Sequence, residues 1–180
     1  MEGPGFCVES YGKGGRHMRI RKAQAQDVEK VWGIYDAILV QEEIHHGPTG
    51  WERGKYPLPQ TARTAFDRGE LFVMEEDGQV LASAVINSLQ APEYRHCPFL
   101  YPAEDEQVMV LHTLVVHPLH AGRGIATRFV AFYEDYARQH LCTVSRMDTN
   151  QRNLPARQLY RKLGWREAPA CPAISTASKM

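Results

Sequence analysis

The stretch that decides the fold is VLHTLVVHPLHAGRGIATRFV, residues 110–130. The apolar, β-branched run from Val108 to Val116 favours a long buried strand. Pro118 has no amide hydrogen to give to a ladder, so it ends that strand. After two glycines, apolar side chains recur at helical spacing, which predicts a helix from Gly124 to about Gln139. A strand, a glycine turn and a helix in this order indicate an α/β protein.

The turn Gly122-Arg123-Gly124 has a physical use of its own. Glycine adopts positive φ and lets another group come close to the backbone. The first amides of the following helix have no partner within the helix and lie at the positive end of its dipole. The turn therefore suits a phosphate or pyrophosphate, with Arg123 as a candidate charged contact. Taken alone it is a weak indication, because an ordinary tight turn uses the same glycines.

Two nucleotide-binding motifs fit this turn poorly. A Walker A loop requires Lys and then Ser or Thr after its last glycine, and Ile125-Ala126 stands there. A dinucleotide-binding fingerprint requires a third glycine, and the position it would occupy is Thr127. A P-loop-like nucleotide enzyme is therefore disfavoured.

The rest of the chain predicts one mixed, mostly antiparallel sheet with helices on both faces. Asp27 is a candidate N-cap, or a first-turn acid, for the first helix. Asp77-Gly78 suits the type I′ turn of a hairpin between two apolar runs. We expect residues 1–17 to form a flexible tail and residues 18–180 a single domain. The other expected elements are a strand from Met18, helices over Pro59–Asp67 and Leu154–Leu163, a strand over Thr143–Thr149, and a strand or tail from Trp165.

Composition and charge narrow the functional classes. Lys and Arg total 21 and Asp and Glu total 21 in 180 residues, so the chain lacks the basic excess typical of nucleic-acid binding. No apolar run reaches the roughly 18 residues of a membrane span, and the first residues lack the apolar core of a secretory signal. We therefore expect a cytoplasmic protein that binds neither nucleic acid nor membrane.

The cysteines and histidines give little sign of a metal site. The four cysteines are far apart and include no CxxC pair, which favours reduced thiols. His45-His46 has no third ligand nearby and is typical of a surface loop. We expect no bound metal.

Two motifs together resemble the GNAT superfamily of N-acetyltransferases. The first combines a strand ending in LxVxP with a glycine turn that opens a helix. Its residues here are Leu114, Val116, Pro118 and the run Ala121–Ala126. The second, N-x-x-A-x-x-L-Y-x-x-x-G-F, matches Asn153, Ala156, Leu159, Tyr160 and Gly164, with Trp165 in place of Phe. The resemblance covers about residues 18–168.

The resemblance implies acetyl-CoA as co-substrate, held between two splayed central strands. One strand ends at Val116 and the other contains Arg146–Asp148. Ala121 replaces the family's usual Arg or Gln, which shifts phosphate binding onto backbone amides. Asn153 would hold the pantetheine, or cap the helix that follows it, and the two roles are compatible. The implied cofactor contacts are the backbone of Leu114, Val115 and Val116, the turn residues Ala121, Gly122, Arg123, Gly124, Ile125, Ala126 and Thr127, and the side chains of Asn153 and Tyr160.

The resemblance also implies an acid and a base. Tyr160 stands at the family's general-acid position, where the alternative is a core tyrosine. The central strand carries no Glu, and His112 is the candidate base, as in the similar arylalkylamine N-acetyltransferases. Strand alternation predicts that His112 shares a face with Leu114 and Val116. The alternative is a buried structural histidine, and Asp148 is interpreted as a turn residue more readily than as a base.

The function implied is direct transfer of an acetyl group to a primary amine of a small molecule or peptide. No cysteine lies on the central strand, which argues against a covalent enzyme intermediate. The alternative is a non-catalytic acyl-CoA-binding or sensing domain, and a homodimer is left open. Aromatic and acidic residues of the expected acceptor pocket suit a cationic or aromatic amine, although the helical ones equally suit core packing. They are Trp32, Tyr35, Trp51, Tyr56, Tyr94, Glu104 and Asp105.

Overall fold

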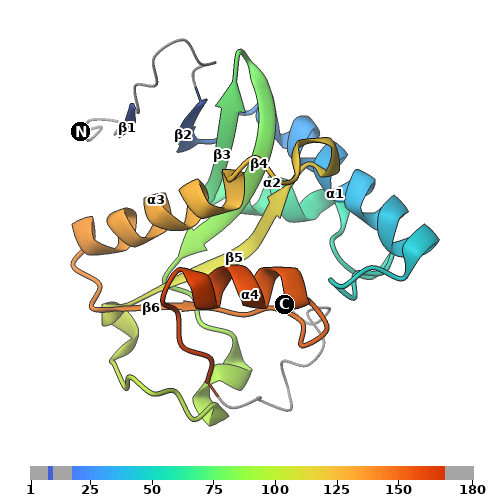
Figure 1. Cartoon of the computed structure of the whole chain (residues 1–180). Coiled ribbons are helices and arrows are strands. Elements are labelled where there is room, and N and C mark those ends of the chain that lie inside the picture. The colour runs from blue at the N-terminus through green and yellow to red at the C-terminus, as the bar shows by residue number, and fades with distance from the viewer. Residues whose placement is uncertain (1–7, 10–17, 169–180) are drawn as a thin grey trace.

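The computed structural model describes residues 8–9 and 18–168 (Figure 1). Within them, six strands form one sheet in the order β1-β2-β3-β4-β5-β6. Every neighbouring pair is antiparallel except β5–β6, which is parallel. The strands are β1 Val8–Glu9, β2 Met18–Lys22, β3 Leu71–Glu76, β4 Gln79–Asn87, β5 Val108–Val116 and β6 Val144–Met147. The predicted mixed, mostly antiparallel sheet is confirmed.

Helices cover both faces of this sheet, as predicted. They are α1 Asp27–His45, α2 Pro59–Asp67, α3 Ile125–Gln139 and α4 Leu154–Lys162. In Figure 1, α3 and α4 cross the near side of the sheet and α2 lies on its far side. Phe72 and Ile86 of the sheet pack with Phe129 and Tyr133 of α3. The opposite face forms a second core with α1 and α2, built from residues such as Val31, Ile34, Tyr35, Ala62, Val73 and Val85.

The predicted hairpin turn at Asp77-Gly78 is confirmed, whereas the predicted N-cap at Asp27 is wrong. Asp77 and Gly78 have φ of 51° and 80°, which confirms the hairpin turn with positive φ at both central residues. Asp27 is not the N-cap of α1, because Gln26 holds that position. The Asp27 carboxylate instead accepts the Gln24 amide at 2.8 Å and pairs with Arg21 at 2.6 Å. Asp27 is therefore a first-turn acid, the other role expected of it.

A β-bulge interrupts β5 and overturns the predicted alternation. Val85 lies opposite His112, but Ser83, two residues earlier, lies opposite Val115, three residues on. The extra residue falls at Thr113, whose φ is 51°. The prediction that His112 shares a face with Leu114 and Val116 is wrong. Leu114 and Val116 pack on the α3 side, whereas His112 pairs with Val85 of the α1–α2 core.

The parallel pair β5–β6 separates partway along β5. The ladder runs from Val108–Val144 to Leu111–Met147, and β5 then continues to Val116. Within the described residues, no strand pairs with that last part of β5 on its β6 side. The predicted splayed central pair is confirmed, although β6 is shorter than the expected strand.

Two further expectations concern the cysteines and the chain ends. Cys97 is disulfide-bonded, so the expectation of reduced thiols is wrong at this position, and Cys142 is a free thiol. Residues 165–168 form no strand. The tail predicted over residues 1–17 lies outside the described residues apart from β1, and so does everything after 168. None of the described helices has both the length and the apolar character needed to cross a membrane.

Candidate active site

The glycine turn between β5 and α3 has the geometry expected of an anion site. Gly122 and Gly124 have φ of 77° and 73°, a conformation that side chains with a Cβ rarely adopt. Gly124 is the N-cap of α3, and its carbonyl accepts the Arg128 amide, the first bond of the helix. The amides of residues 125–127 therefore have no partner inside the helix. Residues 121–124 and Thr127 are exposed, so the turn itself lies at the surface, whereas Ile125 is buried.

Arg123, the charged residue of this turn, forms an ion pair with Glu76. Its Nη2 donates to both carboxylate oxygens of Glu76, at 2.8 and 2.9 Å. Glu76 is only 6% exposed and ends β3, so the pair ties the turn to the hairpin. The Arg123 charge is therefore already paired, and the donors that this turn leaves unpaired by the helix are backbone amides.

Asn153 opens α4 beside the end of β6. Its Oδ1 accepts the Ala156 amide at 3.3 Å, which confirms its expected role as helix cap. Its Nδ2 donates to Thr149 Oγ1 at 3.2 Å. Cofactor contact by Asn153 stays a prediction.

Tyr160 lies on α4 and is half-buried. Its hydroxyl makes no hydrogen bond to any residue in the described part of the chain. Burial, with a smaller contribution from the charge of Asp148, raises the pKa of Tyr160 to about 12. The phenol is therefore protonated at neutral pH and can donate a hydrogen bond.

One ring nitrogen of His112 makes hydrogen bonds, and the other has no partner among the described residues. Its Nε2 lies 3.1 Å from Asn87 Oδ1 and 3.1 Å from the Leu89 carbonyl. The Asn87 amide nitrogen donates to Glu70, which fixes Oδ1 as the atom facing the imidazole. Both neighbours of Nε2 are acceptors, so Nε2 carries the proton and Nδ1 carries the lone pair. Burial lowers the pKa of His112 more than the charge of Asp148 raises it, and the ring is neutral at pH 7.

Asp148 contacts Tyr94 and acts electrostatically on the other site residues, a role that the sequence did not predict. It follows β6 and accepts a hydrogen bond from Tyr94 Oη at 2.6 Å. Burial raises the pKa of Asp148. Its charge raises the pKa of Tyr56, Tyr94, His112 and Tyr160, so all four lie within its field. Tyr94 and Asp148 are 54 residues apart, and no local pattern could have paired them.

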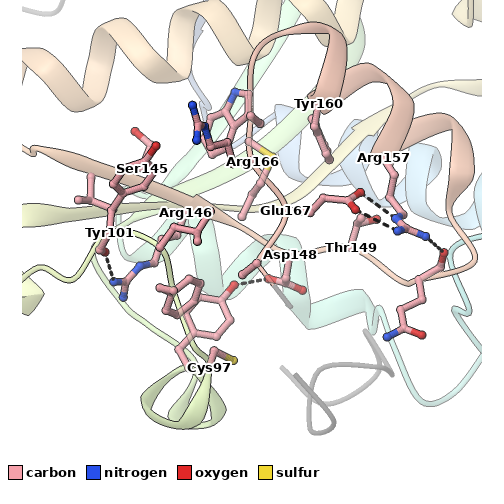
Figure 2. A pocket seen from close by; sticks show the side chains of 18 residues that line it. Cys97, Tyr101, Ser145, Arg146, Asp148, Thr149, Arg157, Tyr160, Arg166 and Glu167 are labelled. Carbon is pink, nitrogen blue, oxygen red and sulfur yellow. Dashed lines mark hydrogen bonds and ion pairs between the residues drawn. The ribbon is translucent and has the colours of Figure 1, made fainter. Parts of the chain in front are cut away.

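A pocket of about 780 Å³ extends along β6 from Asp148 (Figure 2). Its walls include Asp148, Tyr160 on α4, Arg146 on β6, and Tyr101 from the loop before β5. Figure 2 shows Tyr160 extending from α4 and Asp148 from the segment that follows β6. Neither the glycine turn nor His112 lines it. The pocket therefore meets the splayed strands at the end that carries Asp148.

The expected acceptor residues divide between core and site. Tyr35 is fully buried and meets Trp51 edge-on at 5.8 Å between ring centroids, which confirms core packing there. Tyr56 packs edge-on against Trp51 and also reaches the bulge, where its hydroxyl lies 2.6 Å from Thr113 Oγ1. Glu104 and Asp105 are exposed and do not line the pocket. In the described residues, no group of three or more His, Cys, Asp or Glu could hold a metal ion.

Comparisons with known proteins agree with this architecture. The acetyltransferase (GNAT) family matches residues 34–165. A GNAT-family acetyltransferase of Streptococcus agalactiae has a TM-score of 0.74 at 18% identity, covering 86% of this chain and 88% of that one. One from Listeria monocytogenes has a TM-score of 0.71 at 16% identity, covering 91% and 94%. A putative acetyltransferase of Salmonella typhimurium, solved with its cofactor acetyl-CoA, has a TM-score of 0.61 at 20% identity, covering 83% and 79%. No curated protein sequence matches the chain.

Proposed function

Because this chain belongs to the GNAT acetyltransferase family, we propose that it transfers the acetyl group of acetyl-CoA directly to a primary amine of a small molecule or peptide. The open edge of β5 beyond Leu111 carries this proposal. This edge runs from the bulge at Thr113 toward the glycine turn. The first amides of α3, which have no partner within the helix, lie at that turn. An extended arm ending in a pyrophosphate fits such an edge and turn, as an added strand followed by an anion site.

The proposed cofactor contacts follow from these backbone groups. Leu114, Val115 and Val116 pair with the pantetheine arm through main-chain atoms. The amides from Ala121 to Thr127 surround the pyrophosphate. The Arg123–Glu76 pair holds the turn in shape, so the missing Arg or Gln at Ala121 is compensated by a rigid backbone.

The proposed base is Nδ1 of His112. An amine at neutral pH is an ammonium ion and must lose a proton before it attacks the thioester. Asn87 and Leu89 hold the Nε2–H, which leaves the Nδ1 lone pair to take that proton directly or through water. The negative charge of Asp148 favours the imidazolium that forms.

The proposed acid is Tyr160. With a pKa of about 12, its phenol keeps its proton throughout the physiological range. A cysteine-type thiol has a pKa of about 8.5, so full proton transfer from a phenol of pKa about 12 to its thiolate would be uphill. Tyr160 therefore acts mainly by hydrogen-bonding the sulfur while the C–S bond breaks and negative charge develops there, and the thiolate takes up the proton that the amine nitrogen loses as the amide forms.

The cysteines support direct transfer without an acyl-enzyme. Cys142 precedes β6, at the opposite end of that strand from Asp148. Burial raises the pKa of the Cys142 thiol and keeps it protonated. Cys97 lines the pocket but is disulfide-bonded. A thiolate nucleophile is thus not provided by either cysteine of the described residues.

A screen of primary amines with acetyl-CoA, following release of free thiol, tests the proposal. We expect amine-dependent release by the wild type and a kcat about 10²-fold lower for Tyr160→Phe, with little change in KM for the amine. Calorimetry of acetyl-CoA binding to both proteins is the control. Binding without release for any amine would contradict the proposal and favour a non-catalytic acyl-CoA sensor.

A further inference from the structure

Arg146 is a buried cation in the wall of the pocket described above. It is 9% exposed, and its guanidinium carbon lies 3.9 Å from the centroid of the Phe99 ring. It donates to the Tyr101 carbonyl at 3.2 Å and to the side-chain oxygen of Gln90. Both acceptors are neutral. Its buried Nε has no hydrogen-bond partner, and within residues 18–168 the guanidinium forms no ion pair.

An arginine in this state is unusual. Buried arginines are normally paired with a carboxylate, because a charge out of water is costly without a counter-ion. The nearby carboxylate of Asp105 does not bind Arg146 directly. It accepts a hydrogen bond from the Gln90 amide at 2.5 Å, and Gln90 lies between the two charges. A buried donor without an acceptor adds a further penalty. Arg146 therefore carries a positive charge that no carboxylate of the described residues neutralises by direct contact.

None of the other charged side chains in the pocket wall forms an ion pair with Arg146. The Glu167 carboxylate forms an ion pair with Arg157, whose Nε and Nη2 donate to it at 2.9 and 3.1 Å, as Figure 2 shows. Asp148 accepts from Tyr94. Arg166 also lines the pocket and makes no ion pair to a described residue. After the pairing of Glu167 with Arg157, the charges left on the pocket wall are those of Arg146, Arg166 and Asp148.

The pocket has a negative end as well. Asp148 follows Arg146 by two residues, which along an extended strand is about 6.6 Å. Asp148 and Tyr160 line the pocket next to the point where β5 and β6 separate, and Arg146 lines it further back along β6, where that strand is still paired with β5. An ammonium group near Asp148 and an anionic group near Arg146 would satisfy both ends at once.

We propose that the acetyl acceptor is a small amine that also carries a carboxylate a few bonds away, and that Arg146 binds this carboxylate. The assignment rests on the function proposed above. Planar guanidinium and planar carboxylate form two parallel hydrogen bonds, a geometry that a lysine cannot reproduce. Polyamines are disfavoured, because they would bring a second positive charge against Arg146.

Matched acceptors test the assignment: L-amino acids and their carboxamides, which differ in the carboxylate, with each kcat/KM expressed per neutral amine because the amine of the carboxamide is less basic. With the full chain and acetyl-CoA, we expect thiol release with a kcat/KM about tenfold or more higher for the acid than for its amide. Arg146→Gln should bring this ratio close to one, mainly through a higher KM for the acid, while activity on the amide is retained. Arg146→Lys should restore part of the preference. The control is Arg138→Gln, which removes an exposed arginine of α3 and should keep the ratio.

The outcomes separate this inference from the proposed function. An acid-to-amide ratio near one in the wild type, or an equal loss on both acceptors in Arg146→Gln, would overturn the role of Arg146. Acetyl-CoA affinity within about twofold of wild type shows that the variant is folded. Release with simple amines or amides but not with any acid refutes only the carboxylate. No release with any acceptor, despite acetyl-CoA binding, refutes the proposed function and this assignment with it.

Discussion

The face of the sheet on which His112 lies and its tautomer depend on residues that are distant in the sequence. Its position on the central strand was enough to nominate it as a base. Alternation then assigned it to the wrong face, because nothing in LHTLVVH signals the extra residue at Thr113. The tautomer could not be predicted at all, since it depends on Asn87 and Leu89, more than 20 residues away. The same is true of Asp148, whose partner Tyr94 belongs to a distant loop.

At this scale the account predicts a specific pH dependence. A base must be unprotonated to work, and burial lowers the pKa of His112 below its ordinary 6.5. The kcat/KM of the wild type should therefore hold down to pH 6.5 and fall only below it. His112→Ala should lower kcat/KM about 10²-fold and remove this acidic limb. His45→Ala, at the exposed end of α1, is the matched control. A pH–rate profile that His112→Ala leaves unchanged would exclude His112 from the mechanism.

Among the elements, β5 is the one on which the site depends. Its length, its end at Pro118 and the glycine turn after it were all predictable, because proline and glycine act through local backbone geometry. Its bulge and its separation from β6 were not predictable from residue spacing, since both depend on pairing with other strands. The splay was expected only from the resemblance to acetyltransferases.

The turn into α3 gives a prediction at the scale of an element. Gly124 has φ of 73° with no atom within 4 Å of an added Cβ, so alanine there meets backbone strain and not a clash. Gly124→Ala should cost about 1–2 kcal/mol of unfolding free energy and weaken acetyl-CoA binding, because the first amides of α3 shift. Gly33→Ala is the control, since Gly33 lies inside α1 with equally open space. It should stabilise by about 0.5–1 kcal/mol and leave acetyl-CoA binding unchanged. Equal acetyl-CoA affinity in both variants would contradict an anion site at this turn.

The fold brings His112 and Tyr160, the proposed base and acid, toward the point where β5 and β6 separate. His112 reaches it from the α1–α2 side of the sheet, and Tyr160 reaches it from α4. The sequence predicted these two residues and the sheet that carries them. Tyr94 was expected in an acceptor pocket and lines this one, but the course of the pocket along β6 was not predicted, because Arg146 and Tyr101 come together only through the long loop before β5. The disulfide at Cys97 was missed for the same reason, since cysteine spacing says nothing about distant partners.

The central claim is direct acetyl transfer to an amine at this junction, and a mass balance tests it most directly. The protein is incubated with acetyl-CoA and an accepted amine, and free CoA, acetylated amine and the intact mass of the chain are measured together. The account predicts free CoA and acetylated amine in equal amounts, with the chain unmodified. Thiol release without acetylated amine, or an acetyl group that accumulates on the protein before the amine is added, would contradict it.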